Sequence, residues 1–226
     1  MAASHRNLFR PETVDPSLDL AFLVGDVIQA RQTIRPKHLE DPAPDTSQLH
    51  RIFSAAGAAP DHGQVQPWRF ITVPASQRGN LADAFAQSLI ERDQSATNDQ
   101  VSQAREKAFR SPLLILVVVD IQRGNLEIDL FERTLSAGCA VQNILLMATA
   151  LGFGSALTSG KALKAKVLRD LFGLHESENA LCFINIGTAK SPTVRGRRPR
   201  LMNYVSVLGQ GVEEHRDAIS QTIQEE

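Results

Sequence analysis

Apolar residues along the chain follow two spacings, one helical and one typical of strands. Helical spacing occurs in four segments: 17–32, 45–56, 77–92 and 129–151. Strands are predicted at 68–74, 112–120, 180–187 and, more weakly, 204–208. The runs PLLILVVVD and ALCFINIG are apolar without interruption, which is typical of strands buried on both faces. The loose alternation of these helices and strands along the chain predicts a mixed α/β sandwich around a small sheet.

Several boundaries and surfaces follow from local residue types. Asp45 followed by Gln48 predicts a helix start with a capping box, and Gly152 is a typical helix end. The second half of the segment 129–151 is apolar nearly all round, so we expect it in the core or at an interface. The polar segment 93–110 predicts a helix or lid on the surface, and 162–172 a short helix.

Composition restricts the class of protein. The chain has 226 residues, of which 42% are hydrophobic and 22% charged, with no internal repeat. We therefore expect one domain at 16–226 after a loosely ordered segment 1–15. A net charge of −1 gives no global field that would attract nucleic acid or an anionic membrane. Without a signal-like or membrane-spanning run, the expected compartment is the cytoplasm.

Several familiar chemistries lack their residues. The GFG at 152–154 has Leu157 where a dinucleotide fingerprint needs a third glycine. GSALTSGKA has one residue too many for a phosphate loop, and Ala162 replaces the magnesium-binding Ser or Thr. No G-x-S-x-G elbow and no H-x-x-x-H pair occurs, so neither a nucleophile nor a metal is indicated. Two single cysteines, Cys139 and Cys182, are expected as small buried hydrophobes. Any catalysis would depend on a bound cofactor.

Three polar or basic clusters remain: ARQTIR at 30–35, APDHGQVQPWRF at 59–70 and RGRRPR at 195–200. Each has a simple explanation when taken alone. Arginines near a helix end complement its dipole, and Trp68 can belong to the core. The last run can be a solvated tail or a nucleic-acid patch on a non-enzymatic domain, although the rest of the chain balances its charge.

Taken together, in this order and spacing, the clusters resemble the flavin-dependent nitroreductase family. The similarity also includes AGCAVQNILLMATALGFG and runs from about residue 20 to 200. It is greatest to short bacterial members that carry A-P-D-H before Q-P-W. The resemblance implies an α+β fold, a three-layer α/β/α sandwich with a small mixed, mostly antiparallel sheet. It also implies an intertwined homodimer with two FMN sites at the interface.

The resemblance assigns phosphate contacts to the first and last clusters. R-Q-T-I-R is similar to the family's R-R-S-x-R, in which arginines and a hydroxyl meet the FMN phosphate. The corresponding residues are Arg31, Gln32, Thr33 and Arg35. Gln32 stands where a second Arg is common, so one charge is lost. The late basic run adds Arg195 and Arg197, with Arg198 as a further candidate.

Other residues are assigned to the flavin ring by the same resemblance. His62 and Gln64 would meet the polar edge of the ring, with Gln64 in place of a frequent Asn, while Gln66 shapes the turn. Trp68 is expected to anchor the strand in the core rather than to touch the flavin. Leu157, Thr158 and Ser159 lie where relatives often carry Trp-Arg-Ser, which makes this pocket smaller-sided and less charged.

The implied activity is ping-pong hydride transfer from NADH or NADPH, through N5 of FMN, to a nitroaromatic or quinone. No side chain is predicted to act as acid, base or nucleophile, and no metal is implied. Two alternatives remain open: a flavin oxidase or dehalogenase on the same scaffold, and a flavin-binding protein without turnover. In the second case the segment 93–110 would be a partner surface.

Overall fold

Strand β3 (Leu113–Asp120) lies at the centre of the fold, with both of its faces buried. Ile115, Val117 and Val119 pack into one hydrophobic cluster. Leu114, Leu116 and Val118 pack into a second cluster. Successive side chains of a strand point to opposite faces, so a continuous apolar run supplies two cores at once. The prediction of a doubly buried strand is confirmed.

Five strands form the sheet in the computed structural model, in the order β1-β5-β3-β2 with β4 also pairing with β5. Their bounds are β1 (Leu39–Glu40), β2 (Trp68–Thr72), β4 (Gly154–Thr158) and β5 (Glu178–Ala189). Among the described residues every ladder is antiparallel, and one isolated bridge, between Thr33 and Ser155, is parallel. The predicted small, mostly antiparallel sheet is therefore present.

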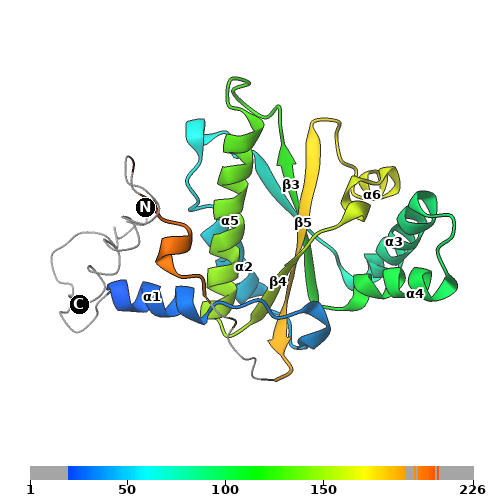
Figure 1. The fold of residues 1–226 in the computed structure, drawn as a ribbon, viewed down its shortest axis with the longest axis horizontal. Coiled ribbons are helices and arrows are strands. Elements are labelled where there is room, and N and C mark those ends of the chain that lie inside the picture. Colours follow the sequence, from blue (N-terminus) through cyan, green and yellow to red (C-terminus); the bar gives the residue numbers. More distant parts are fainter. Residues whose placement is uncertain (1–19, 192–195, 197, 207, 209–226) are drawn as a thin grey trace, which may run out of the picture. The chain divides into compact units, whose positions relative to one another are not determined.

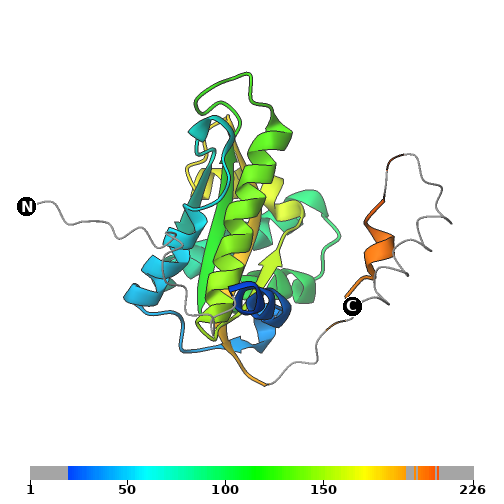
Figure 2. The ribbon, with the colours of Figure 1, turned by 90° about the vertical axis from the view of Figure 1, so that its left-hand side faces the viewer.

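Helices cover both faces of this sheet (Figures 1 and 2). One layer contains α2 (Thr46–Ala56) and α5 (Leu130–Ala150), which pack on the first cluster. The other contains α3 (Arg78–Arg92), α4 (Asn98–Glu106) and α6 (Lys166–Leu171). Helix α1 (Leu20–Ala30) lies near the C-terminal end of α5. The three-layer α/β/α arrangement is as expected.

Short 3-10 turns join these elements at Pro36–His38, His62–Gln64, Ala75–Gln77, Lys107–Phe109, Lys161–Lys164 and Leu201–Asn203. The structure describes residues 20–191, 196, 198–206 and 208. Contacts divide the chain into two units, 1–192 and 193–226, each described by itself. The predicted segment 1–15 lies outside the described residues, and the single domain 16–226 stays a prediction.

The ends of α5 follow from their residues. The Asp129 carboxylate accepts from the backbone N–H of Glu132, 2.9 Å away, and Glu132 returns the contact to Asp129 N–H in a capping box. Gly152 stops the helix with φ +86°, a conformation that glycine adopts without steric cost. The second half of α5 is largely buried or half-buried, as its all-round apolarity predicts.

Two differences from the predicted elements concern strands. Residues 154–158 form β4, although no strand is predicted there, because pairing with β5 imposes an extended backbone on small residues. The weak strand predicted at 204–208 is wrong, since residues 204–206 and 208 lie in turn and irregular structure. The polar segment 93–110 does contain a helix, α4, followed by the turn Lys107–Phe109.

Candidate functional site

The predicted phosphate segment, residues 31–35, lies against β4. Thr33 forms the parallel bridge with Ser155, and Ile34 N–H donates to the Ser155 carbonyl at 2.9 Å. The Ile34 side chain is buried, while Thr33 and Arg35 are exposed and Arg31 is half-buried. Ile34 thus anchors the segment in the protein and leaves the polar residues beside it at the surface.

Close approach between this segment and β4 depends on Gly154. A Cβ at that position would lie 2.9 Å from Ile34 Cγ1 and 2.9 Å from Leu39 Cδ2. Those distances are shorter than van der Waals contact, so any larger side chain would push the segment away. The sequence G-F-G therefore has a packing role here rather than a dinucleotide-binding one.

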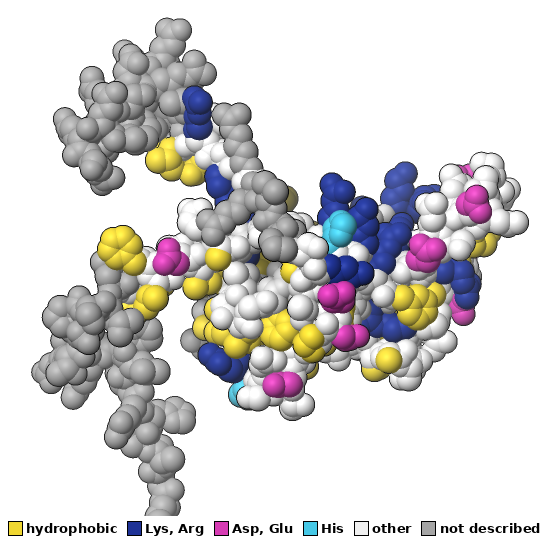
Figure 3. All heavy atoms as spheres, turned by 90° about the horizontal axis from the view of Figure 1, so that it is seen from below, with side chains coloured by type: hydrophobic (Ala, Val, Ile, Leu, Met, Phe, Trp, Pro, Cys, Tyr) yellow, Lys and Arg dark blue, Asp and Glu magenta, His cyan; other side chains and the backbone are white. Residues whose placement is uncertain are grey.

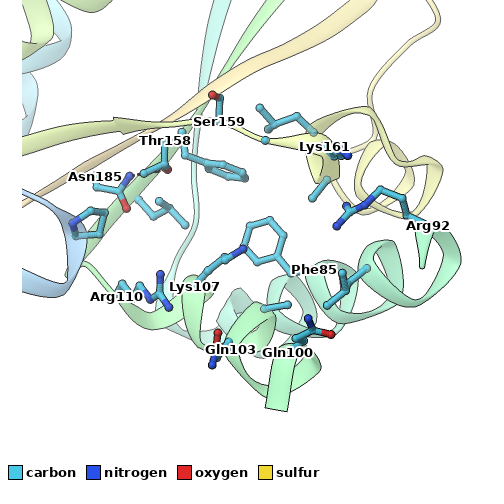
Figure 4. A pocket seen from close by; sticks show the side chains of 18 residues that line it. Phe85, Arg92, Gln100, Gln103, Lys107, Arg110, Thr158, Ser159, Lys161 and Asn185 are labelled. Atoms are coloured by element: carbon cyan, nitrogen blue, oxygen red, sulfur yellow. Dashed lines mark hydrogen bonds between the residues drawn. The ribbon is translucent and has the colours of Figure 1, made fainter. Parts of the chain in front are cut away.

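The end of β4 borders a cavity of about 580 Å³ (Figure 4), whereas the predicted Leu157 is 45% exposed and is not part of the cavity lining. Thr158 and Ser159 line the cavity, and so does Pro36, which follows Arg35. At its wall the buried Asn185 donates to Thr158 Oγ1 at 3.0 Å and accepts from Ser111 Oγ at 3.0 Å. The structure therefore brings the segment 31–35 and residues 157–159 into one region.

The opposite wall comes from α3, α4 and the turn 107–109, and a buried arginine holds that turn in place. Arg78 donates to the carbonyls of Val73 (3.0 Å), Ala108 (2.6 Å) and Pro112 (3.0 Å). Burial lowers the pKa of Arg78 from its ordinary value. Its bonds to Ala108 and Pro112 hold the turn 107–109 and the residue before β3, and Lys107 and the neighbouring Arg110 line the cavity.

The loop before Q-P-W has a constrained backbone. Gly63, Gln64 and Gln66 have φ of +66°, +52° and +46°, the left-handed region that glutamine seldom adopts. The Asp61 carboxylate supports this conformation by accepting from Gln66 N–H at 2.6 Å. Strained backbone of this kind is often found at binding sites. Trp68 at the end of the loop is buried in the first cluster, as predicted.

His62 contacts the beginning of α5. Its Nδ1 lies 2.9 Å from the Glu132 carboxylate, and the side chains of both residues are substantially exposed. Gln64 and Gln66 are also exposed. The loop therefore presents its polar side chains at the surface, beside the N-terminal end of α5 (Figure 1).

A single chain does not bring all the predicted flavin residues together. The loop 62–66 contacts α5 near its start, at Glu132. The phosphate segment contacts Ser155 through Thr33, and Ser155 comes shortly after the end of α5 at Ala150. Glu132 and Ala150 lie about 27 Å apart along the helix axis, at about 1.5 Å per residue. That distance exceeds the length of an FMN molecule. The phosphate segment and the loop thus lie at opposite ends of α5.

The last predicted cluster belongs to the second unit of the chain. Arg195 and Arg197 lie outside the described residues. Arg198 is described and exposed. The phosphate role of these three arginines stays a prediction.

Other chemistries find little support in the described part of the chain. No group of three or more His, Cys, Asp or Glu that could hold a metal ion occurs there. Burial raises the pKa of Cys182 to about 11, so its thiol is protonated at neutral pH and is no nucleophile. Among the described helices, none has the length and apolarity needed to cross a membrane.

Four basic residues of the cavity are not predicted from the sequence: Arg92, Lys107, Arg110 and Lys161. Three of them fall in or next to the polar segment 93–110, and its basic residues were the available signal. Their convergence with Lys161 depends on the packing of α3 and α4 beside β4, which no spacing in the sequence indicates.

Comparisons with known proteins agree on one family. Residues 28–188 match the Nitroreductase family. A Haemophilus influenzae protein named "Putative NAD(P)H nitroreductase" is 35% identical over 159 residues, covering 70% of this chain and 85% of that protein. A similarly named Escherichia coli protein is 34% identical over 150 residues, or 66% of this chain and 80% of that protein.

Solved structures show the same fold. A nitroreductase-like family protein from Bacillus cereus has a TM-score of 0.71 at 19% identity, covering 83% of this chain and 96% of that one. The FMN-dependent nitroreductase NfnB from Mycobacterium smegmatis, solved in complex with NADPH, has a TM-score of 0.67 at 18% identity. That alignment covers 84% of this chain and 99% of the other.

Proposed function

The chain belongs to the nitroreductase family and is an oxidoreductase, and we propose that it is an FMN-dependent enzyme. In this proposal NADH or NADPH is the electron donor, and an electron-poor molecule such as a nitroaromatic or quinone is the acceptor. The observation that carries it is the docking of the arginine segment 31–35 on β4, next to the cavity that Thr158 and Ser159 line.

The residues present fit an FMN phosphate. A phosphate dianion is best held by charged, forked donors together with hydroxyls. Arg31 and Arg35 supply the charges, and Thr33 supplies an exposed hydroxyl between them. Nearby, the Ser155 hydroxyl is buried and has no hydrogen-bond partner among the described residues. A buried hydroxyl without a partner is costly, and this one belongs to the residue that pairs with Thr33.

The role of the chain in catalysis is to bind and orient. When bound, FMN would supply the redox chemistry, a hydride transfer between the nicotinamide and the acceptor. The segment 31–35 would hold the phosphate end, and Leu157, Thr158 and Ser159 would position the ring. His62 and Gln64 would contact the polar edge of the ring, and Gln66 would shape the turn that presents them.

A homodimer is part of the proposal, because the loop and the phosphate segment lie too far apart in one chain. A second copy would bring its loop 62–66 to the first copy's segment 31–35. Apolar surface supports such pairing: α1 has no buried residue, and Phe22 in it is 72% exposed. On α5, Phe131 is 82% exposed and Leu135 70%. Exposed apolar surface of this kind is typical of a protein interface.

The proposed function is tested by the visible absorption spectrum of the purified protein, followed without oxygen by addition of NADH and then NADPH. We expect a flavin spectrum that bleaches with the donor and recovers when a quinone or nitroaromatic is added. Flavin that never bleaches would instead support a binding role. A colourless protein that takes up no added FMN would contradict the proposal.

The same spectrum tests the phosphate assignment. We expect the variant Arg31→Ala with Arg197→Ala to fold but to purify largely without flavin, since two of the positive charges assigned to bind the phosphate are lost. Its matched control is Arg51→Ala with Arg200→Ala, which removes one arginine from each unit outside the assigned set. Full flavin occupancy in the first variant would remove Arg31 and Arg197 from the site.

A further inference from the structure

The cavity beside β4 carries charge of one sign. Its charged lining residues are Arg92, Lys107, Arg110 and Lys161, and its described lining includes no aspartate or glutamate. We call it the basic cavity. Figure 4 shows these four exposed side chains around the cavity, with Arg92, Lys107 and Arg110 on one wall and Lys161, from the turn after β4, on the other. Seen from below, Lys and Arg gather on this side of the described surface (Figure 3).

These cations are poorly compensated by neighbouring carboxylates. Arg110 lies 4.0 Å from the Glu106 carboxylate, at the limit of an ion pair. The exposed Asp93 carboxylate interacts electrostatically with Arg92 but forms no salt bridge with it, and within the described residues Lys107 and Lys161 form no salt bridge either. Four cations around one concave surface focus a positive potential there, because the protein wall has a low dielectric constant. An anion placed among them would be attracted by all four.

Below the charged rim, the wall of the basic cavity is apolar and partly aromatic. Phe85 and Phe183 meet edge to face with ring centroids 5.8 Å apart, and Leu89 and Leu114 also line the wall. Gln100 and Gln103 add amide donors and acceptors. A volume of about 580 Å³ is in the range of small-molecule sites. The shape and chemistry suit a flat apolar molecule with a negative group at the mouth.

We propose that the basic cavity selects reactants that carry a carboxylate or phosphate beside a flat apolar body, with Arg92 and Lys161 as specificity-determining residues. The proposal rests on the proposed function, because the cavity shares Thr158 and Ser159 with the assigned flavin residues. The anionic group can belong to the acceptor, as in a nitroaromatic carboxylate. It can also belong to the donor, as the 2′-phosphate that distinguishes NADPH from NADH.

The test measures dissociation constants by calorimetry on the oxidised, FMN-loaded protein, with no electron donor present. One arm compares 4-nitrobenzoate with the neutral 4-nitrobenzamide, and the other compares 2′,5′-ADP with 5′-AMP. We expect the more anionic member of at least one pair to bind about tenfold more tightly at low salt. The preference should shrink as salt is raised, since exposed charges are screened. The arm that shows it identifies the source of the anion.

The variant Arg92→Gln with Lys161→Gln should abolish that preference and leave the affinity for the neutral member unchanged. The control variant Lys164→Gln with Arg51→Gln removes two exposed cations outside the basic cavity. This variant should keep the preference for the anionic member. Two results would overturn this inference and leave the proposed function standing. In the first, flavin-loaded protein shows no preference for the anionic member in either arm. In the second, the preference survives in the variant Arg92→Gln with Lys161→Gln. Protein that holds no FMN would overturn the proposed function as well.

Discussion

Buried charged side chains in this protein have hydrogen-bond partners of two kinds. Arg133, 1% exposed, donates to the backbone carbonyls of Ile128 (2.8 Å), Arg123 (2.6 Å) and Asn125 (2.5 Å). Glu178 instead receives two hydrogen bonds from the Arg69 guanidinium, at 2.5 and 2.8 Å. The first arrangement orders the loop before α5 without any carboxylate. The second makes stability depend on pH.

The Arg69 hydrogen bond lowers the pKa of Glu178 below its ordinary value of 4.5, despite the opposing effect of burial. A depressed pKa contributes stability that is fully present above pH 4.5 and is lost as the pH falls through the folded-state pKa. We therefore expect Glu178→Gln to lower the free energy of unfolding by about 2 kcal/mol at pH 7. This deficit should narrow as the pH falls below 4.5.

Urea unfolding at a series of pH values measures this effect. Glu106→Gln is the matched control, since Glu106 is exposed and lies 4.0 Å from its arginine. It should change stability little at any pH. A Glu178→Gln deficit that stays constant down to pH 3 would show that the ionised Glu178 does not stabilise the fold.

At the scale of elements, predictions succeeded where a pattern was local. The capping box of α2 is formed by the predicted pair, with the Asp45 carboxylate 2.8 Å from Gln48 N–H. The helix stop at Gly152 is also local, since it needs only a residue that tolerates positive φ. Strand β4 was missed because its conformation depends on pairing with β5, 29 residues away at Ala156–Asn185. A strand made of small residues has little signal of its own.

The fit between β4 and the segment 31–35 gives a test at this scale. Gly154→Ala places a methyl group 2.9 Å from Ile34 and Leu39, so the segment must shift. We expect FMN affinity to fall about tenfold and stability to fall by about 1–3 kcal/mol. Flavin titration of the apoprotein measures the first effect and urea unfolding the second.

Gly79→Ala on α3 is the control for this variant, because a Cβ there would meet no atom within 4 Å. Its flavin affinity should equal that of the wild type. If Gly154→Ala binds FMN as tightly as the control, then the position of the segment 31–35 against β4 is unimportant for the cofactor.

At the scale of the whole molecule, the proposed dimer would complete each flavin site. Phe131→Glu with Leu135→Glu places two carboxylates on the exposed apolar stripe of α5. We expect this variant to be monomeric at micromolar concentration by light scattering, and to lose bound FMN with the dimer. The change lies at the surface of the single chain, so the fold itself should survive.

Ile90→Glu is the control for the dimer, since Ile90 is 49% exposed on α3, in the other helical layer. It should remain dimeric and keep its flavin. A wild-type chain that is monomeric while fully loaded with FMN would contradict the interface site.

The sequence alone determined the family, the three-layer fold, the strands β2, β3 and β5 and the helices α2, α3 and α5, because these depend on periodicity and on ordered local motifs. It also indicated the segments 31–35 and 157–159, which the tertiary structure brings together. Only the tertiary structure revealed β4, the separation of the loop 62–66 from the phosphate segment, and the convergence of Arg92, Lys107, Arg110 and Lys161. The physical reason is that sheet pairing and helix packing set distances between residues far apart in the chain, on which local spacing carries no information.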